Sequence, residues 1–289
     1  MDDIINEILQ ELESPKTTIS DEKLQTFLYE EMDRIGGIVD ESVTPRQRSA
    51  RTSALVRKVR PLITAENELD RLNQLLDVIY CQMKFSYRYT DYFNSDNLVL
   101  HKVLQTKQGM PVSFAAILLY LAAKCGIPLF AVNFPTQIIL RAEITHYDGR
   151  QETLFINPVD GKFLSIEDLE KWLDGEPPMV GVLVTPVLIR RAEPFELLER
   201  VETLFKMALT KEKKFQEVLE MINFRLIFSP DDPYEIRDRG MIFATMDCFQ
   251  AAYEDLSYFV DQCPDDPSAM MIKMDIKQLE QKGKEIVLH

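Results

Sequence analysis

Ser113 is the residue whose type and setting come closest to those of a catalytic nucleophile. The stretch GMPVSF, residues 109–114, places this serine in the first turn of a long apolar segment that runs to Cys125. Many thiol enzymes place their nucleophile in such a position, because the dipole of a helix N-terminus stabilises an anion. A serine in the same position needs a base that removes its proton.

Three regions of the chain would have to position such a site. The first, up to about residue 94, is predicted to be helical because its apolar residues recur at helical spacing, beginning with Ile4, Ile5, Ile8, Leu9 and Leu12. Another helix is predicted to follow an N-cap at Ser20 and to stop at Gly36-Gly37. The arginine-rich residues 45–58 are predicted to form a solvated face or loop, and residues 69–79 a further helix.

The second region, about residues 96–190, combines a helix with antiparallel strands. The apolar helix 112–125 is expected to end at Gly126. Strands are predicted at residues 129–134, 137–145 and 153–156, the last two joined by a hairpin turn. Ser165 stands three residues before an aspartate, a capping-box pattern that predicts a helix running through Trp172. This order predicts an α+β unit, with the helical N-terminal region packed on it.

The third region, from Pro194 onward, is predicted to be helical and contains an internal repeat. The sequence Pro-Asp-Asp-Pro at residues 230–233 recurs at 264–267, an offset of 34 residues. That offset is the period of tetratricopeptide repeats. Gly240 is expected to let two helices approach, and Ala252 to be the small contact of the second helix. Two helix pairs and a closing helix after Pro267 would form a short solenoid, with plain helical hairpins as the alternative.

The central region resembles the core of transglutaminase-like proteins over roughly residues 85–175. With the repeats, most of the chain resembles the SirB/YchA-type family of bacterial transglutaminase-like proteins. The residues that carry this resemblance are HKVLQTKQGMPVSFAAILLYLAAKCGIPLFAVNFPTQIILR, FINPVDGKFLS, PYEIRDRG and the closing IVLH. The resemblance implies a papain-like core of helix plus antiparallel sheet, followed by an all-α tail. We expect three parts: residues 1–94, residues 95–192, which fold together with the first part, and residues 193–289.

The resemblance also implies where a catalytic triad would stand. Active members of the superfamily carry a thiol at the helix start, a histidine on the next strand and an Asp or Asn on the strand after. The matching positions here are Ser113, Gln137 and Asn157. A helix dipole contributes about 1 kcal/mol, too little to ionise a serine hydroxyl near neutrality. A carboxamide at position 137 is no base, and Asn157 has no histidine there to orient.

No other histidine is an obvious replacement for the missing base. His146 lies at the hairpin tip, about 30 Å from Gln137 along an extended strand. His289 is the last residue of the chain and would have to fold back. His101 is geometrically open as a partner of Ser113, although such a residue is more often a surface or satisfied histidine.

The three triad positions also have structural interpretations, which the missing base favours. Ser113 would cap or line the first helical turn, its hydroxyl bonding a backbone N–H after Pro111. Gln137 would make strand-edge or site-lining hydrogen bonds. Asn157, which precedes Pro158, would belong to a turn.

The composition limits the classes of partner and cofactor. With 33 Lys and Arg against 47 Asp and Glu, the net charge is −14, which argues against nucleic-acid or membrane-surface binding. The longest apolar run, residues 114–123, is too short to span a bilayer. Four scattered cysteines and an acidic N-terminus predict a reduced protein in the cytoplasm. Metal-binding and nucleotide-binding motifs are missing, so no cofactor and no metal are expected.

The leading functional prediction is a non-catalytic interaction or regulatory scaffold that binds a protein or peptide partner. Tyr234, Arg237 and Arg239 are candidates for a partner groove in the repeats, unless the arginines form ion pairs with neighbours or across helices. One alternative is a peptidase, amidase or acyltransferase with Ser113 as nucleophile. Another is a purely structural core that supports a binding tail. The C-terminal residues 286–289 are apolar enough to predict that they dock on the protein body.

Overall fold

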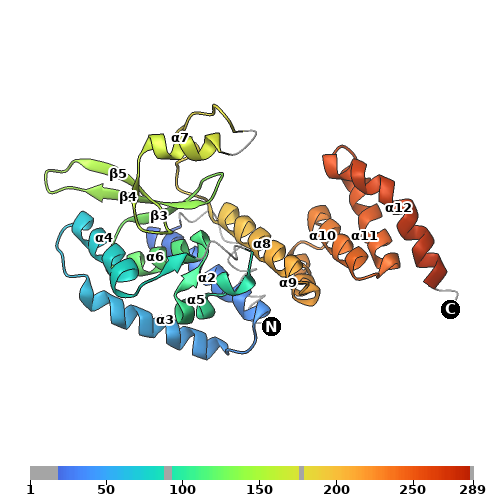
Figure 1. Ribbon diagram of the computed structural model, residues 1–289, viewed down its shortest axis with the longest axis horizontal. Coiled ribbons are helices and arrows are strands. Elements are labelled where there is room, and N and C mark those ends of the chain that lie inside the picture. Colours follow the sequence, from blue (N-terminus) through green and yellow to red (C-terminus); the bar gives the residue numbers. More distant parts are fainter. Residues whose placement is uncertain (1–18, 88–92, 176–178, 287–289) are drawn as a thin grey trace. The chain divides into compact units, whose positions relative to one another are not determined.

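The computed structural model describes residues 19–87, 93–175 and 179–286, with side chains up to residue 283 (Figure 1). The described chain forms two compact units. The first contains residues up to Glu31, Ala54–Lys84 and Phe114–Leu197; the second contains Met32–Ser53, Phe85–Ser113 and the chain from Leu198 onward. The predicted division at residues 94 and 192 stays a prediction. The predicted helix around residues 4–12 and the tail residues 287–289 lie outside the described residues.

A four-stranded antiparallel sheet forms the centre of the first unit. Its strands follow one another in the order β3 (Leu129–Asn133), β4 (Ile138–Thr145), β5 (Gln151–Ile156) and β6 (Phe163–Leu164). Leu129 pairs with Ala142, and Leu140 pairs with Ile156. The predicted strands are therefore confirmed, and each successive pair is joined by a short connection, as expected for an antiparallel meander.

One face of the sheet is covered by α7 (Ile166–Asp174) (Figure 1). Leu169 and Leu173 of this helix pack with strand residues that include Val132 and Ile139. The predicted capping box is present, since Ser165 Oγ accepts the Asp168 N–H at 3.1 Å and Asp168 Oδ2 accepts the Ser165 N–H at 3.0 Å. Local sequence thus determines where α7 begins, and its apolar stripe determines which side faces the sheet.

Two helices lie on the side of the sheet away from α7 (Figure 1). They are α4 (Glu68–Asp77), which continues into a π-helical turn Val78–Gln82, and α6 (Pro111–Cys125). Residues 111–119 of α6 are all buried, so this helix is apolar on every side, as expected for a core helix. It ends where predicted, at Gly126, whose φ of +63° is a conformation that glycine adopts without strain.

The helix predicted to stop at Gly36-Gly37 passes through both glycines. This helix, α2, spans Asp21–Val39. A Cβ atom at position 37 would lie 2.4 Å from Nη2 of Arg48, a residue of the next helix, α3 (Pro45–Val59). Arg48 is held there by a 3.1 Å ion pair with Asp33 and a hydrogen bond to Val43 O. Gly37 therefore makes room for an arginine and does not end the helix. The arginine-rich stretch itself is helical, with Leu55 and Val59 buried.

The second unit joins short elements to the helices of the C-terminal region. A 3-10 turn (Ser95–Asn97), α5 (Leu100–Thr106) and the parallel pair β1 (Ser86–Tyr87) and β2 (Gln108–Gly109) precede α6. Ser95 is anchored to the end of the first C-terminal helix, because its N–H and Oγ donate to the two carboxylate oxygens of Glu212 at 2.6 and 2.7 Å.

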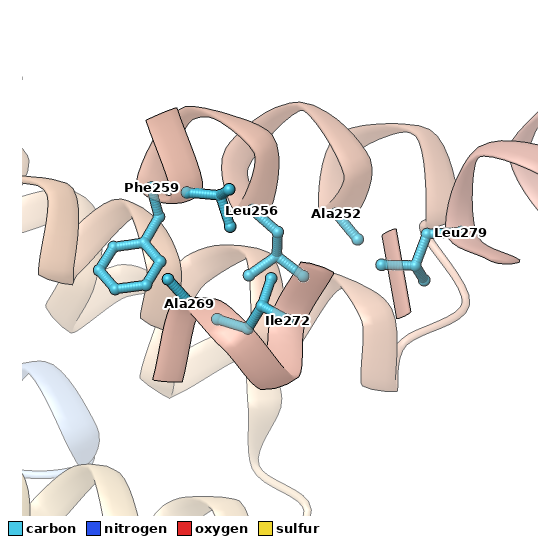
Figure 2. Packing of buried hydrophobic residues seen from close by; sticks show 7 residues of the cluster. Ala252, Leu256, Phe259, Ala269, Ile272 and Leu279 are labelled. Carbon is cyan, nitrogen blue, oxygen red and sulfur yellow. The ribbon is translucent and has the colours of Figure 1, made fainter. Parts of the chain in front are cut away.

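The C-terminal region consists of helices in the predicted repeat order. The helices are α8 (Pro194–Lys211), α9 (Phe215–Phe228), α10 (Pro233–Thr245), α11 (Phe249–Gln262) and α12 (Pro267–Ile286). Apolar side chains of α11 and α12 point toward one another: Ala252, Leu256 and Phe259 on one helix meet Ala269, Ile272 and Leu279 on the other (Figure 2). The predicted role of Gly240 is confirmed, since a Cβ there would lie 2.9 Å from Leu256 Cγ.

Candidate functional site

Ser113 lies in the first turn of α6, as predicted, but its hydroxyl is fully buried. Its Oγ donates a 2.5 Å hydrogen bond to Asn97 O in the preceding 3-10 turn. The Met110 N–H donates to the same carbonyl at 3.3 Å. The expectation that the hydroxyl bonds a backbone N–H was wrong, because the hydroxyl donates to a carbonyl of the preceding turn. The single hydroxyl hydrogen is therefore used to hold the start of the helix.

Gln137 and Asn157, twenty residues apart, meet as the triad positions of the resemblance require. Gln137 stands just before β4, and Asn157 just after β5. The Gln137 Nε2 donates to Asn157 Oδ1 at 3.2 Å. An imidazole N–H in place of the carboxamide would be oriented by the same oxygen. A carboxamide retains this hydrogen bond and supplies no basic nitrogen.

The turn that carries Asn157 is held by several further contacts. Asn157 Oδ1 also accepts the Val159 N–H at 3.1 Å, which confirms the turn predicted for an Asn before a Pro. The Tyr80 hydroxyl donates to Pro158 O at 2.5 Å. Its ring lies against Gly161, where a Cβ would be 2.7 Å from the ring carbons. These contacts fix the Asn157 side chain in position to receive Gln137.

Ser113 and Gln137 belong to different compact units. The prediction that they face each other across a cleft stays a prediction. Among the described residues, neither side chain is bonded to a base: Ser113 donates to a carbonyl oxygen and Gln137 to a carboxamide oxygen.

His101, the candidate base for Ser113, is engaged elsewhere. It is 4% exposed, and its Nε2 lies 3.1 Å from Asp40 Oδ2. Asp40 also forms a 2.8 Å ion pair with Lys102. Burial lowers the pKa of His101 below its ordinary value, although Asp40 acts in the opposite direction. Because the Ser113 hydroxyl donates to Asn97, no Ser113–His101 dyad is formed in this structure.

The three groove candidates of α10 have different surroundings. Tyr234 is 48% exposed, and its hydroxyl donates to Asp266 Oδ2 at 3.2 Å. The Arg237 guanidinium lies 5.3 Å from the Tyr234 ring centroid and bonds Asp238 at 2.7 Å. Arg239 binds Asp255 of α11 through two hydrogen bonds of 2.7 and 2.8 Å. The ion pairs considered as the alternative are thus present, and the role of these residues in a partner groove stays a prediction.

The second aspartate of each Pro-Asp-Asp-Pro sequence caps a helix. Asp232 Oδ1 accepts the N–H groups of Tyr234 and Glu235 at 3.0 and 3.3 Å, at the start of α10. Asp266 Oδ1 accepts the Ser268 N–H at 2.7 Å at the start of α12. Both oxygens satisfy amides that a helix start otherwise leaves unpaired, which accounts for the recurrence of the second aspartate.

Comparison with known proteins agrees with this arrangement. Residues 47–203 match the family model described as the transglutaminase-like superfamily. This chain belongs to that superfamily. Residues 205–277 of this transglutaminase-like protein match a tetratricopeptide repeat model. No solved structure matches the chain.

The curated relatives of this transglutaminase-like protein resemble it over most of their length. It is 36% identical to protein SirB1 of Salmonella typhimurium, over 91% of this chain and 88% of the relative. It is also 36% identical to the UPF0162 protein YchA of Escherichia coli, over 91% and 88%. A UPF0162 protein of Pasteurella multocida is 44% identical over 73% of this chain and 78% of its own length.

Two features of this transglutaminase-like protein were missed from its sequence. Asp40, the partner of His101, stands 61 residues before it, and no local pattern connects them. Met207 and Met241 are both about half exposed on the repeat helices. These methionines are 34 residues apart, so the repeat period could have identified them as equivalent positions.

Proposed function

We propose that this protein is a non-catalytic interaction protein, in which a transglutaminase-like core without its catalytic base is joined to partner-binding repeats. The observation that carries this proposal is the Gln137–Asn157 hydrogen bond of 3.2 Å. A carboxamide takes the place where the superfamily resemblance puts the imidazole. The contact that would orient a base is kept, and the base is missing.

The state of Ser113 supports the same conclusion. A nucleophilic serine must be reached by its substrate and must pass its proton to a base during attack. The Ser113 hydroxyl is fully buried, and its hydrogen is committed to Asn97 O. Attack by this oxygen would require the start of α6 to open and a base to approach.

A serine-directed probe tests the absence of catalysis. The full chain is incubated with a fluorophosphonate, and labelling is followed by mass spectrometry, with a known serine hydrolase as the control for reagent activity. We expect no adduct at Ser113. An adduct that forms on the folded wild type and disappears in Ser113→Ala would favour the alternative function, a peptidase, amidase or acyltransferase that uses Ser113.

Partner binding is assigned to the repeat region. Tetratricopeptide repeats present a groove formed by the first helix of each repeat. On α10, Tyr234 and Arg237 offer an exposed ring and a guanidinium beside it, and Arg239 holds α10 to α11 through Asp255. The net charge of −14 favours a protein partner over a nucleic acid. The four unpaired cysteines fit the predicted cytoplasmic location.

Crosslinked capture by the full chain tests where the partner binds. We expect the double variant Tyr234→Ala, Arg237→Ala to lose crosslinked partners that the wild type and Gln137→Ala both retain. Circular dichroism confirms that each variant is folded. Loss of capture in Gln137→Ala alone would instead assign binding to the former catalytic region.

A further inference from the structure

Two hollows open along the repeat helices, and they share one side chain. The first, of about 520 Å³, is bounded by α8, α9 and α10, with Phe93 also in its wall. The second, of about 360 Å³, is bounded by α10, α11 and α12. Met241 of α10 lines both. The two hollows are therefore neighbours along one surface of the second unit.

The repeat period shows that the two hollows are equivalent. Met207 and Met241 are 34 residues apart, and so are Thr210 and Ala244. The residue 34 positions after Met241 is Asp275, which lines the second hollow. Corresponding positions of successive repeats thus form corresponding parts of the wall. Packed helices lie about 8–10 Å apart, so the hollows repeat at about this distance.

The walls of the first hollow are apolar but unfilled. Met207 is 48% exposed and Met241 is 52% exposed, although both are apolar. Val218, Ile222 and Ile242 complete the wall between them. Unbranched methionine side chains adapt to the shape of an apolar ligand. This hollow fits one bulky apolar side chain of a partner.

The two hollows together form a groove, and Lys211 lies at the end of this groove that is away from the second hollow. Lys211 lines the first hollow and also a polar hollow of about 400 Å³ beyond it, and its Nζ lies 5.7 Å from the Phe93 ring centroid. In the described part of the chain, Lys211 has no carboxylate partner. Lys206, by contrast, bonds Glu235 at 2.7 Å and Asp238 at 3.1 Å.

The other charges around the polar hollow are already paired. Glu212 accepts from Ser95 and forms a 2.6 Å ion pair with Lys214. Asp96 forms a 2.8 Å ion pair with Lys102. Among the described residues that line the polar hollow, Lys211 is thus the cation left to attract a carboxylate of a partner. Although the whole chain has a net charge of −14, this lysine favours an acidic ligand segment at one end of the groove.

We infer that this groove binds an extended, acidic and apolar segment of a partner protein. One bulky apolar side chain enters the first hollow, and a second one, three residues later, enters the second hollow. In the extended polyproline-II conformation, three residues span about 9 Å and bring the next side chain back to the same side of the chain, which matches the repeat distance of the hollows. Carboxylates just before the first apolar residue lie at Lys211. This inference rests on the proposed partner-binding function and specifies its ligand.

A defined peptide tests the inferred chemistry. The probe is a fluorescein-labelled peptide, Gly-Asp-Asp-Phe-Ser-Ser-Leu-Gly, titrated with the full chain by fluorescence anisotropy. We expect saturable binding that weakens at least about fivefold when the two aspartates are replaced by lysines, and also when Leu is replaced by Ser. Equal binding of the lysine peptide, or no binding of the acidic one, would overturn the inferred ligand.

Protein variants locate the binding. Met241→Lys should weaken binding of the acidic peptide at least about tenfold, because it places a charge in both hollows. Met270→Lys is the matched control: Met270 is an exposed methionine of α12, 71% exposed, and lines neither hollow. Lys211→Glu should weaken binding about threefold to tenfold, whereas Lys273→Glu, also exposed, should not. Equal losses in test and control variants would overturn the assignment to this groove.

Crosslinked capture separates failure of this inference from failure of the proposed function. If Met241→Lys abolishes partner capture while the acidic peptide does not bind, the groove is a partner site and the inferred ligand chemistry is wrong. If every repeat-helix variant captures partners as the wild type does, the proposed function loses its site as well.

Discussion

Two helical glycines should respond in opposite directions when each is replaced by alanine. Alanine is favoured over glycine inside a helix by about 1 kcal/mol. A Cβ at Gly36 of α2 would lie 3.6 Å from Val99, an ordinary van der Waals distance. Gly36→Ala should therefore stabilise the protein by about 0.5–1 kcal/mol.

Gly240 lies against a neighbouring helix with no such space. A Cβ there would lie 2.9 Å from both Asp255 Cβ and Leu256 Cγ of α11. Asp255 Cβ is attached directly to the backbone, so α11 itself has to move. Overpacking of this kind costs about 1–3 kcal/mol. After the gain in helix propensity is subtracted, Gly240→Ala should destabilise the α10–α11 pair by up to about 2 kcal/mol.

Hydrogen exchange measures this effect where it occurs. Repeat helices open locally, so amides of α10 and α11 report their own opening free energy. A loss of about 1.4 kcal/mol in the opening free energy makes exchange about tenfold faster in the regime where opening is at equilibrium. Gly36→Ala is the control, and its exchange in α2 should become slower. If the amides of α10 and α11 are as well protected from exchange in Gly240→Ala as in the wild type, the inferred close contact is wrong.

Three further substitutions test other contacts. Burial lowers the pKa of His101 in the folded protein. The stability that the neutral imidazole contributes is therefore complete above the unfolded pKa of about 6.5, and it is lost as the pH falls through the folded pKa. His101→Asn should reduce this loss of stability, measured by urea titrations between pH 7 and 5. Arg239→Met should cost about 1–3 kcal/mol of stability, because it leaves the Asp255 carboxylate, which is 9% exposed, without its two hydrogen-bond donors. The loss should be seen as a lower urea midpoint, and Arg239→Lys should recover part of it. Ser165→Ala should cost about 1 kcal/mol through loss of the α7 cap, measured as faster amide exchange in α7 alone.

Among the described residues, no helix combines the length and the hydropathy needed to cross a bilayer. This agrees with the short apolar run of α6, whose buried residues are used to pack the core.

The features predicted correctly from the sequence depend on neighbouring residues. The capping box of α7 joins Ser165 to Asp168, and Gly126 ends α6 through its own backbone conformation. The order of the repeat helices follows from a pattern that recurs every 34 residues. Hydrophobic periodicity, caps and turns act over a few residues, so they can be recognised without knowledge of the tertiary structure.

The tertiary structure decided which distant groups satisfy the polar side chains. Gly37 lies inside α2, and its missing side chain leaves space for Arg48 from the next helix. Ser113 donates to a carbonyl sixteen residues earlier, and Gln137 to a side chain twenty residues later. A buried polar group must find a partner, and chain packing determines which partner is near. The sequence by itself therefore indicated a helix start without a base, and the tertiary structure decided that its hydroxyl is buried and holds the helix start.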